Sequence, residues 1–298
     1  MEYHMDVGFI GLGRMGFPMA GHIQKQGASG RLTLLDRFPE RLSELVAGGA
    51  ELAGDAREVA RNSDLVILMV PAIGDIDALL EGPDGLLAGV ERPLILVVSS
   101  TTSAKDVRDL QARLNDLGAP VTVVDAPVSG GVEGAEGGSL SIMIGGPDSA
   151  AKAVVDVMSA TGNAVHLGPL GAGQVAKACN QLIVAAEVVA VAEASLLAER
   201  AGLDVARLFD LLSTSYAASR ILEVKGPKFV NHDHAAAGPA KFLIKDLKAV
   251  IEEAEVSGLR LVTVDALLGA YTALTEAGLG DEDASVVQQW IEDSSARA

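Results

Sequence analysis

A short apolar run followed at once by a glycine-rich turn is the feature that most limits how this chain can fold. Residues 7–12 read VGFIGL, and a helical pattern begins soon afterwards. The turn between them consists of Gly11, Leu12, Gly13, Arg14, Met15 and Gly16. Alone, G-x-G-x-x-G is a weak signal, but a strand before it and a helix after it favour phosphate binding over an empty glycine-rich turn. The glycines let the backbone approach a pyrophosphate, whose charge is stabilised by the helix N-terminus.

An acidic residue stands where such a unit would bind a ribose. The next apolar run, 32–35, ends in Asp36, twenty residues after Gly16. This separation is expected of a carboxylate that accepts hydrogen bonds from the adenosine ribose of NAD. Arg37 follows directly, and an arginine there is able to hold the 2′-phosphate of NADP. With the carboxylate nearer the ribose, we expect NAD as the cofactor, and NADP is less favoured.

Strand-like and helix-like segments alternate through the first half of the chain. One apolar run, 65–70, ends at Val70 and Pro71, and another, 94–98, is followed closely by Thr101. This alternation predicts an α/β fold with a doubly wound parallel sheet. Ligands of such sheets bind beyond the carboxyl ends of the strands. We therefore expect Val70, Pro71 and Thr101 to contact the cofactor.

A further strand, 122–125, leads into a second glycine-containing turn. Ser129, Gly130 and Gly131 follow it after three residues. Successive glycines expose backbone N–H groups, and Ser129 adds a hydroxyl, so the turn is suited to hold a carboxylate. An ordinary turn without a ligand is the alternative.

From Gly168 onwards strand signals disappear and long aliphatic helical runs take over. Such runs cover 171–200, 204–213, roughly 240–257 and 260–277. We predict two domains, a dinucleotide-binding domain at 1–167 and an all-α domain at 168–298, joined by a long buried helix. Glu187 and Glu193 near the centre of that helix argue against a membrane span.

Lys177 lies at the head of this apolar helix. A buried lysine is costly unless another group pairs with it or the protein uses it. It is a candidate for a functional group, and a lysine that reaches water from the helix end is the alternative.

The composition excludes several classes of partner. The net charge is −17 without any Lys/Arg block, which argues against binding to nucleic acid or an anionic membrane. Cys179 is the only cysteine, so an internal disulfide is impossible and the cytoplasm is the expected compartment. The N-terminus lacks the pattern of a signal peptide. His232 and His234 are expected in a solvated loop, and no metal site is expected.

These segments, in this order, resemble the β-hydroxyacid dehydrogenase family, which includes 3-hydroxyisobutyrate dehydrogenases and tartronate semialdehyde (2-hydroxy-3-oxopropionate) reductases. The matching motifs are GFIGLGRMGFPMA at 8–20, DAPVSGG at 125–131, GAGQVAKACNQ at 171–181 and KDL at 245–247. The resemblance implies an N-terminal Rossmann domain and a C-terminal helical domain. It also implies a homodimer or homotetramer built on the helical domain.

The resemblance further implies roles for individual residues. Lys177 would be the catalytic acid or base. Ser129, Gly130 and Gly131 would hold the carboxylate of a small substrate, and Asn180 would orient that substrate. Thr101 and Lys245 would lie beside the nicotinamide.

Two positions depart from the family pattern. Val98 stands where members often carry Asp, and Gln181 replaces the second Asn of the lysine motif. Reductases of the tartronate semialdehyde type also show the second change, so it leans towards them.

The leading hypothesis is hydride transfer between NAD(H) and a small β-hydroxy acid or its semialdehyde, with Lys177 as general acid or base. NADPH-linked reduction of glyoxylate or succinic semialdehyde is an alternative within this class. A non-catalytic dinucleotide-sensing module is an alternative of another class. Lys177 speaks against imine reductases, which are expected to replace this lysine.

Overall fold

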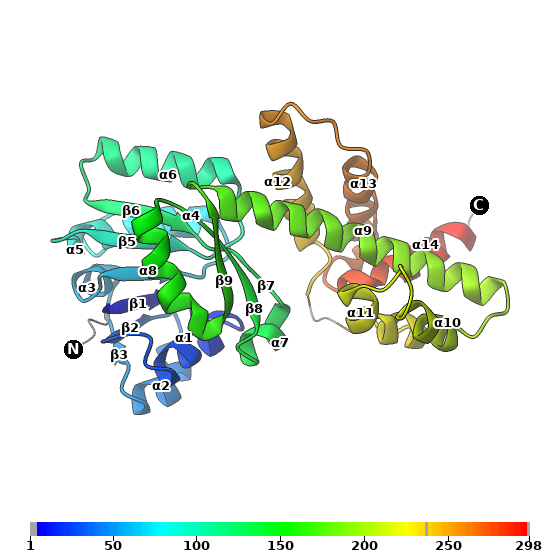
Figure 1. Ribbon diagram of the computed structural model, residues 1–298, viewed down its shortest axis with the longest axis horizontal. Helices are drawn as coiled ribbons and strands as arrows, with labels where there is room; N and C mark the ends of the chain where they lie inside the picture. The colour runs from blue at the N-terminus through cyan, green and yellow to red at the C-terminus, as the bar shows by residue number, and fades with distance from the viewer. Residues whose placement is uncertain (1–4, 236–237, 297–298) are drawn as a thin grey trace. The chain divides into compact units, whose positions relative to one another are not determined.

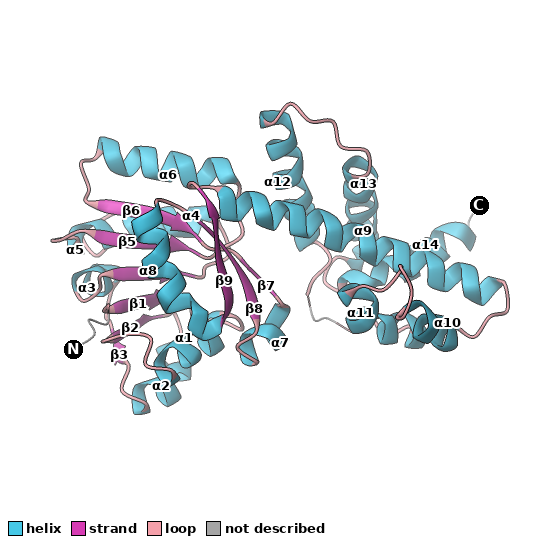
Figure 2. Cartoon of the chain, viewed as in Figure 1, coloured by secondary structure: helices cyan, strands magenta, loops and turns pink. Residues whose placement is uncertain are grey.

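A computed structural model describes residues 5–235 and 238–296 of the chain. The chain divides into two compact units, Met1–Lys177 and Ala178–Ala298. The first unit contains a sheet with helices on it, and the described part of the second is helical (Figures 1 and 2).

The described part of the first unit contains one nine-stranded sheet, with the order β3-β2-β1-β4-β5-β6-β8-β7 and with β9 beside β8. The strands are β1 Val7–Ile10, β2 Leu32–Leu35, β3 Glu51–Leu52, β4 Leu65–Leu68, β5 Leu94–Val98, β6 Val121–Asp125, β7 Val128–Ser129, β8 Leu140–Gly145 and β9 Gly162–Gly168. Strands β1 to β6 pair in parallel, which confirms the predicted doubly wound sheet. The far edge is mixed, because β8 runs antiparallel to both β6 and β7. Residues 130–139 connect β7 to β8, and this connection, which includes the short helix 131–136, is still shorter than the crossover of about a dozen residues or more that a parallel pair needs.

Helices cover both faces of the sheet (Figure 1). They are α1 Gly16–Lys25, α2 Ser43–Ala47, α3 Ala56–Arg61, α4 Ile73–Leu80, α5 Leu86–Gly89, α6 Ala104–Asp116, α7 Gly131–Glu136 and α8 Asp148–Met158. Phe9 and Ile67 belong to the core beneath α1, α2 and α8. Val66 and Leu68 belong to the core beneath α3, α4, α5 and α6. Successive side chains of a strand point to opposite faces, so central strands must be apolar throughout.

The second unit has its own core, which includes Phe229, Leu247 and Tyr271. Its helices are the larger part of α9 Ala172–Arg200, then α10 Val205–Leu212, α11 Arg220–Asn231, α12 Phe242–Val256, α13 Val264–Leu274 and α14 Val287–Ala296. The sequence runs did not predict α11 and α14. Gly226 and Pro227 lie inside α11 and both disfavour a helix, so tertiary packing outweighs local preference there.

Helix α9 is long and continuous as predicted, but it is buried only in part. Ala185 and Val188 lie in the core of the second unit, whereas Ile183 and Leu197 are 57% and 73% exposed. The expectation of a helix buried all round is therefore corrected, because the described helices leave one side of α9 uncovered. By length and composition alone, α9 is long and apolar enough to cross a membrane. Its core contacts are those of a helix in a globular unit.

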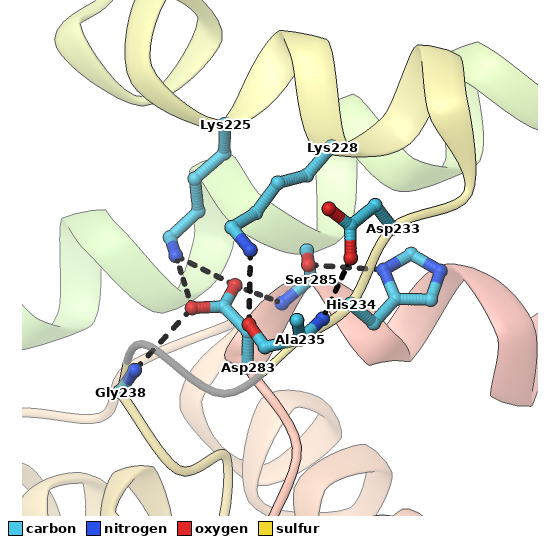
Figure 3. Close-up of polar contacts among 8 residues, drawn as sticks. All are labelled: Lys225, Lys228, Asp233, His234, Ala235, Gly238, Asp283 and Ser285. Atoms are coloured by element: carbon cyan, nitrogen blue, oxygen red, sulfur yellow. Dashed lines mark hydrogen bonds and ion pairs between the residues drawn. The ribbon is translucent and has the colours of Figure 1, made fainter.

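A buried polar cluster joins the segment after α11 to the segment before α14 (Figure 3). The carboxylate of Asp283 is fully buried, and the Lys225 ammonium donates to its two oxygens at 2.7 and 2.9 Å. The Ser285 backbone N–H donates to the same carboxylate at 3.0 Å. Burial alone would raise the pKa of Asp283, but these donors and the Lys225 charge keep it below its ordinary value.

His234 belongs to this cluster rather than to a solvated loop. Its side chain is 8% exposed and its Nδ1 lies 3.0 Å from Ser285 Oγ. The expected solvated loop is therefore wrong for His234, because the segment folds back against residues before α14. The sequence pattern NHDH carries no apolar signal that would predict this burial.

Asp283→Asn should lower the free energy of unfolding of the helical unit by about 3 kcal/mol, because it leaves the partly buried Lys225 ammonium without a charged partner. Urea titration followed by fluorescence of Trp290, the only tryptophan, measures this. Asp281→Asn is the matched control, since it breaks an exposed ion pair with Lys241 and should change the same quantity by under about 1 kcal/mol. An equal loss of unfolding free energy in the two variants would show that the buried Lys225–Asp283 pair is no more important for stability than an exposed ion pair.

His234→Asn should flatten the pH dependence of stability on the acid side. Burial lowers the pKa of His234 from 6.5, with a smaller contribution from His232, so the unfolded chain binds a proton more readily than the folded one. Its contribution to stability is therefore present above pH 6.5 and is lost as the pH falls through the lowered folded pKa. Urea titrations at a series of pH values, again read from Trp290, should show a steeper acid-side loss in the wild type. Parallel profiles would contradict this account.

Candidate active site in the first unit

The glycine-rich turn between β1 and α1 has the geometry of a phosphate-binding loop. Gly11 has φ +91°, and a Cβ there would lie 2.3 Å from the Met69 carbonyl oxygen. A Cβ on Gly16 would lie 2.0 Å from the Gly11 carbonyl oxygen, so both positions require glycine. A Cβ on Gly13 would meet no described atom within 4 Å. Helix α1 has no side-chain cap and no acidic residue in its first turn, which suits an anion.

Asp36, at the end of β2, lies against this turn. Its Oδ2 accepts the Leu12 N–H at 2.7 Å, and its Oδ1 accepts the Phe38 N–H at 2.9 Å. Arg37 is exposed, and the Arg41 guanidinium lies 4.5 Å from the centre of the Phe38 ring. The structure thus brings the predicted ribose-binding acid and the glycine turn together by a direct hydrogen bond.

The loops after β4 and β5 are also joined. Strand β4 ends at Leu68, two residues earlier than the apolar run, so Val70 lies in the loop beyond it. The Val70 N–H donates to Ser100 Oγ at 3.1 Å, and Ser100 is 3% exposed. This bond places the predicted cofactor residues Val70 and Thr101 on adjoining loops at the carboxyl edge of the sheet. Pro71, next in the chain, is exposed.

The turn after β7 contains the proposed carboxylate site. Gly130 and Gly131 have φ values of +134° and +65°, which favour glycine. The partly exposed Ser129 precedes them, and Gly131 begins α7. Glu133 is near this turn, since a Cβ on Gly131 would lie 2.9 Å from its carboxylate. A bound carboxylate therefore needs a nearby positive charge.

Lys177 supplies a positive charge beside that turn. Its side chain is 8% exposed, and its Nζ donates to the Val128 carbonyl oxygen at 2.8 Å. Val128 directly precedes Ser129, so the structure brings the predicted catalytic lysine and the predicted carboxylate cradle together. The lysine is buried, and the alternative of a solvent-reaching side chain is wrong.

The buried carboxylate of Asp125 holds the beginning of the lysine helix. Its two oxygens accept the Gly171 and Gln174 N–H groups, each at 2.7 Å. Burial raises its pKa to about 6, and the backbone donors, led by Gly171, limit the rise. Sequence reasoning missed this role, because backbone N–H groups leave no signal in a sequence. The only sequence signal for this role was the position of Asp125 at the end of a predicted strand, as the first residue of the DAPVSGG motif.

The other predicted residues belong to the second unit. The Asn180 side-chain amide donates to Gln181 Oε1 at 2.9 Å, and Gln181 in turn donates to the Asp246 carboxylate. Asp246 is 8% exposed, whereas the neighbouring Lys245 is exposed. Gln181, the departure from the family pattern, therefore fixes α12 against α9 within this unit. The Gln181 side chain thus has a structural partner, Asp246, that the sequence motif alone did not predict.

The geometry fits a dinucleotide and defines the class of protein. The open position at Gly13, the close backbone approach at Gly11 and Gly16, and the acid at the end of β2 are features of a Rossmann dinucleotide site. A buried lysine beside a glycine turn, at the carboxyl edge of the same sheet, adds a group that can move protons. These features define a dinucleotide-dependent oxidoreductase.

Comparisons with known proteins identify the family. Residues 6–169 match the NAD binding domain of 6-phosphogluconate dehydrogenase, and residues 171–291 match the NAD-binding domain of NADP-dependent 3-hydroxyisobutyrate dehydrogenase. The chain is 34% identical to the NAD-dependent L-serine dehydrogenase of Pseudomonas aeruginosa over 95% of this chain and 97% of that protein. It is 32% identical to the 2-hydroxy-3-oxopropionate reductase of Escherichia coli over 97% of each. The structure of Mycobacterium tuberculosis 3-hydroxyisobutyrate dehydrogenase with L-serine matches with a TM-score of 0.83 and 29% identity, over 97% of this chain and 99% of that one.

This chain belongs to the β-hydroxyacid dehydrogenase family, and it is an NAD-linked oxidoreductase that acts on the CH–OH group of hydroxy acids. The predicted family, fold class and type of reaction are confirmed.

Gly13→Ala should weaken NADH binding by about tenfold or more without unfolding the protein, because the added methyl group enters space that no described residue fills. Fluorescence titration with NADH measures the dissociation constant, and thermal unfolding measures stability. Gly269→Ala is the control, since Gly269 is an exposed glycine within α13 and its Cβ also meets nothing within 4 Å. An unchanged dissociation constant in Gly13→Ala would place the dinucleotide elsewhere.

Proposed function

We propose that this chain interconverts a small 3-hydroxy acid and its semialdehyde, with Lys177 as the general acid and base. The observation that carries the proposal is the contact between Lys177 Nζ and the Val128 carbonyl, which fixes the ammonium one residue before Ser129. The names of the relatives support substrates of the size of 3-hydroxyisobutyrate, L-serine and 2-hydroxy-3-oxopropionate.

The first unit offers a place for each end of the cofactor. The turn from Gly11 to Gly16 would hold the pyrophosphate and Asp36 the adenosine ribose, while Val70, Pro71 and Thr101 would line the nicotinamide end. Lys245 of the second unit is proposed beside the nicotinamide because of the family motif. When bound, NAD supplies the hydride chemistry.

Lys177 handles the proton. In reduction its ammonium gives a proton to the substrate oxygen, and in oxidation its neutral amine takes the proton of the hydroxyl group. The Val128 carbonyl orients the amine without itself exchanging a proton. Holding the group in place before reaction lowers the entropic part of the barrier.

The substrate carboxylate is proposed to bind at Ser129, Gly130 and Gly131, with Asn180 orienting the rest of the substrate. The Ser129 hydroxyl and the backbone N–H groups of the turn are its donors. The Lys177 ammonium supplies the positive charge that a carboxylate needs in a protein of net charge −17 and close to Glu133.

The direct test is reduced-nicotinamide absorbance with a panel of 3-hydroxy acids and semialdehydes, each with NAD(H) and NADP(H). Turnover of at least one small 3-hydroxy acid is expected. A panel that supports turnover only of glyoxylate or succinic semialdehyde with NADPH would favour the alternative activity.

Lys177→Ala should lower kcat by about 10² to 10⁴-fold, because general acid–base catalysis contributes that much. NADH binding should remain close to that of the wild type, since Lys177 bonds the Val128 carbonyl next to the turn at 129–131, whereas the pyrophosphate is proposed to bind at the turn at 11–16. Lys177→Arg should fail as well, because a guanidinium does not release its proton near neutral pH. A Lys177→Ala enzyme with more than about a tenth of the wild-type kcat would remove Lys177 from this role.

Asp36→Asn should shift the NAD to NADP ratio of kcat/KM by about fivefold towards NADP, since an exposed charge contact is worth about 1 kcal/mol. The substitution removes repulsion of a 2′-phosphate and leaves Arg37 to bind it. The ratio is the proper readout, because Asn also disturbs one of the two backbone bonds that Asp36 accepts and so weakens both coenzymes. The wild type is expected to prefer NAD. An unchanged ratio in Asp36→Asn would mean that Arg37, and not Asp36, determines the coenzyme preference.

The assembly and the compartment are proposed on surface and composition. Exposed apolar side chains on helices of the second unit and on the loop between α12 and α13 support a homodimer or homotetramer built on that unit: Ile183, Leu197, Leu211, Val256, Leu259 and Val262. Light scattering after gel filtration tests this, and a monomer would contradict it. Cys179 as the only cysteine supports the cytoplasm.

A further inference from the structure

The side-chain amide of Gln174 clamps the loop after β5. Gln174 is 2% exposed. Its Nε2 donates to the Ser100 carbonyl oxygen at 2.9 Å, and its Oε1 accepts the Thr102 N–H at 3.1 Å. Both ends of one amide are therefore satisfied by backbone groups on either side of Thr101. A buried amide with both partners in place holds the backbone in one conformation.

The backbone of Gln174 is fixed as well. Its N–H donates to the Asp125 carboxylate at 2.7 Å, within the first turn of α9. Lys177 follows three residues later, so the two side chains lie one turn apart on neighbouring positions of the helix surface. The clamped loop also reaches β4, because Ser100 Oγ accepts the Val70 N–H. Gln174 thus links the loops after β4 and β5 and the last residue of β6 to the helix that carries Lys177.

We propose that Gln174 is a positioning residue that holds the loop around Thr101 in a fixed position relative to Lys177. The proposal rests on the proposed function, in which Thr101 lies at the nicotinamide end of the cofactor and Lys177 moves the proton. Hydride and proton leave or join the same carbinol group, so both groups must be correctly placed at once. Gln174 couples their positions through one amide and one helical turn, without contact with the reacting atoms.

The same unit contains a matched clamp far from this edge of the sheet. Gln111 of α6 donates from Nε2 to the Val121 carbonyl oxygen at 3.1 Å and accepts the Val123 N–H at Oε1 at 2.7 Å. It brackets one residue of β6, just as Gln174 brackets Thr101. Its bonds lie at the start of β6, whereas ligands of such sheets bind at the strand ends. Gln111 therefore serves as a control with similar bonding and no positioning role.

The experiment compares Gln174→Met and Gln111→Met, because methionine conserves volume and removes the side-chain hydrogen bonds of each amide, which for Gln111 include one to Asn115. Four quantities are measured: thermal stability, the NADH dissociation constant, the split between kcat and KM for the hydroxy acid, and the kinetic isotope effect with substrate deuterated at the carbinol carbon. Gln174→Met should lower kcat by about 10 to 100-fold, as a displacement of about 1 Å does. Its KM for the acid and its NADH dissociation constant should change by less than about threefold, because the carboxylate turn and the glycine turn bind independently of this amide. The isotope effect should rise, since hydride transfer becomes rate-limiting.

Gln111→Met should lose stability while keeping kcat within about twofold of the wild type. A folded Gln174→Met enzyme with wild-type kcat, or a Gln111→Met enzyme with an equal loss of kcat, would overturn the proposal. If Gln174→Met does not fold, Gln174→Glu takes its place, since it retains an acceptor for Thr102 and loses the donor to Ser100. A wild-type kcat in that variant would also overturn the proposal. An inactive wild type would instead contradict the proposed function, so the two failures are distinct.

Discussion

The buried carboxylate of Asp125 is the interaction on which the arrangement of the first unit depends. It ends β6 and accepts two backbone N–H groups from the start of α9. Close packing makes this possible: a Cβ on Gly145 would lie 2.5 Å from Asp125 Oδ1, and one on Gly173 would lie 2.1 Å from the Met143 carbonyl oxygen. Burial raises the pKa of Asp125 to about 6, so at neutral pH the group is still mostly ionised and meets the positive end of the helix. Because the helix start is fixed in this way, the position of Lys177 follows from the sheet.

The doubly wound sheet then explains why distant segments form one site. Parallel strands present their carboxyl ends at one edge. The loops after β1, β4 and β5 carry the glycine turn, Val70 and Thr101, Asp36 directly follows β2, and Ser129 is the last residue of β7. Direct bonds join these loops in pairs, from Asp36 to Leu12 and from Ser100 to Val70. Lys177 joins the last of them through the Val128 carbonyl. The loops that carry the glycine turn, Val70 and Thr101 are thus parts of one hydrogen-bonded framework with Lys177, while Asn180 and Lys245 belong to the helical unit.

The features that were correctly predicted from the sequence are those that depend on a few neighbouring residues. The glycine turn, Asp36 and the parallel strands were predictable, because steric freedom and apolar runs leave a direct mark on the sequence. The contact between Lys177 and Val128 was not, since it joins residues far apart in the chain and its acceptor is a backbone carbonyl. The same reason hides the caps made by Asp125 and the clamp made by Gln174. Strand β9 was missed because its residues alternate between partly buried and exposed and its apolar signal is weak. The roles of the individual site residues, and the exact domain boundary, remain predictions.

The claim that Lys177 moves the proton is tested most directly by chemical rescue. Turnover of the Lys177→Ala protein would be measured with added primary amines of graded pKa, and with tetramethylammonium as an aprotic cation of similar charge. The account predicts that amines restore the rate in proportion to their concentration and with a Brønsted dependence on their pKa, whereas tetramethylammonium has no effect. Equal restoration by tetramethylammonium would show that only positive charge is needed at this position, and it would contradict the assignment of Lys177 as the proton-transfer group.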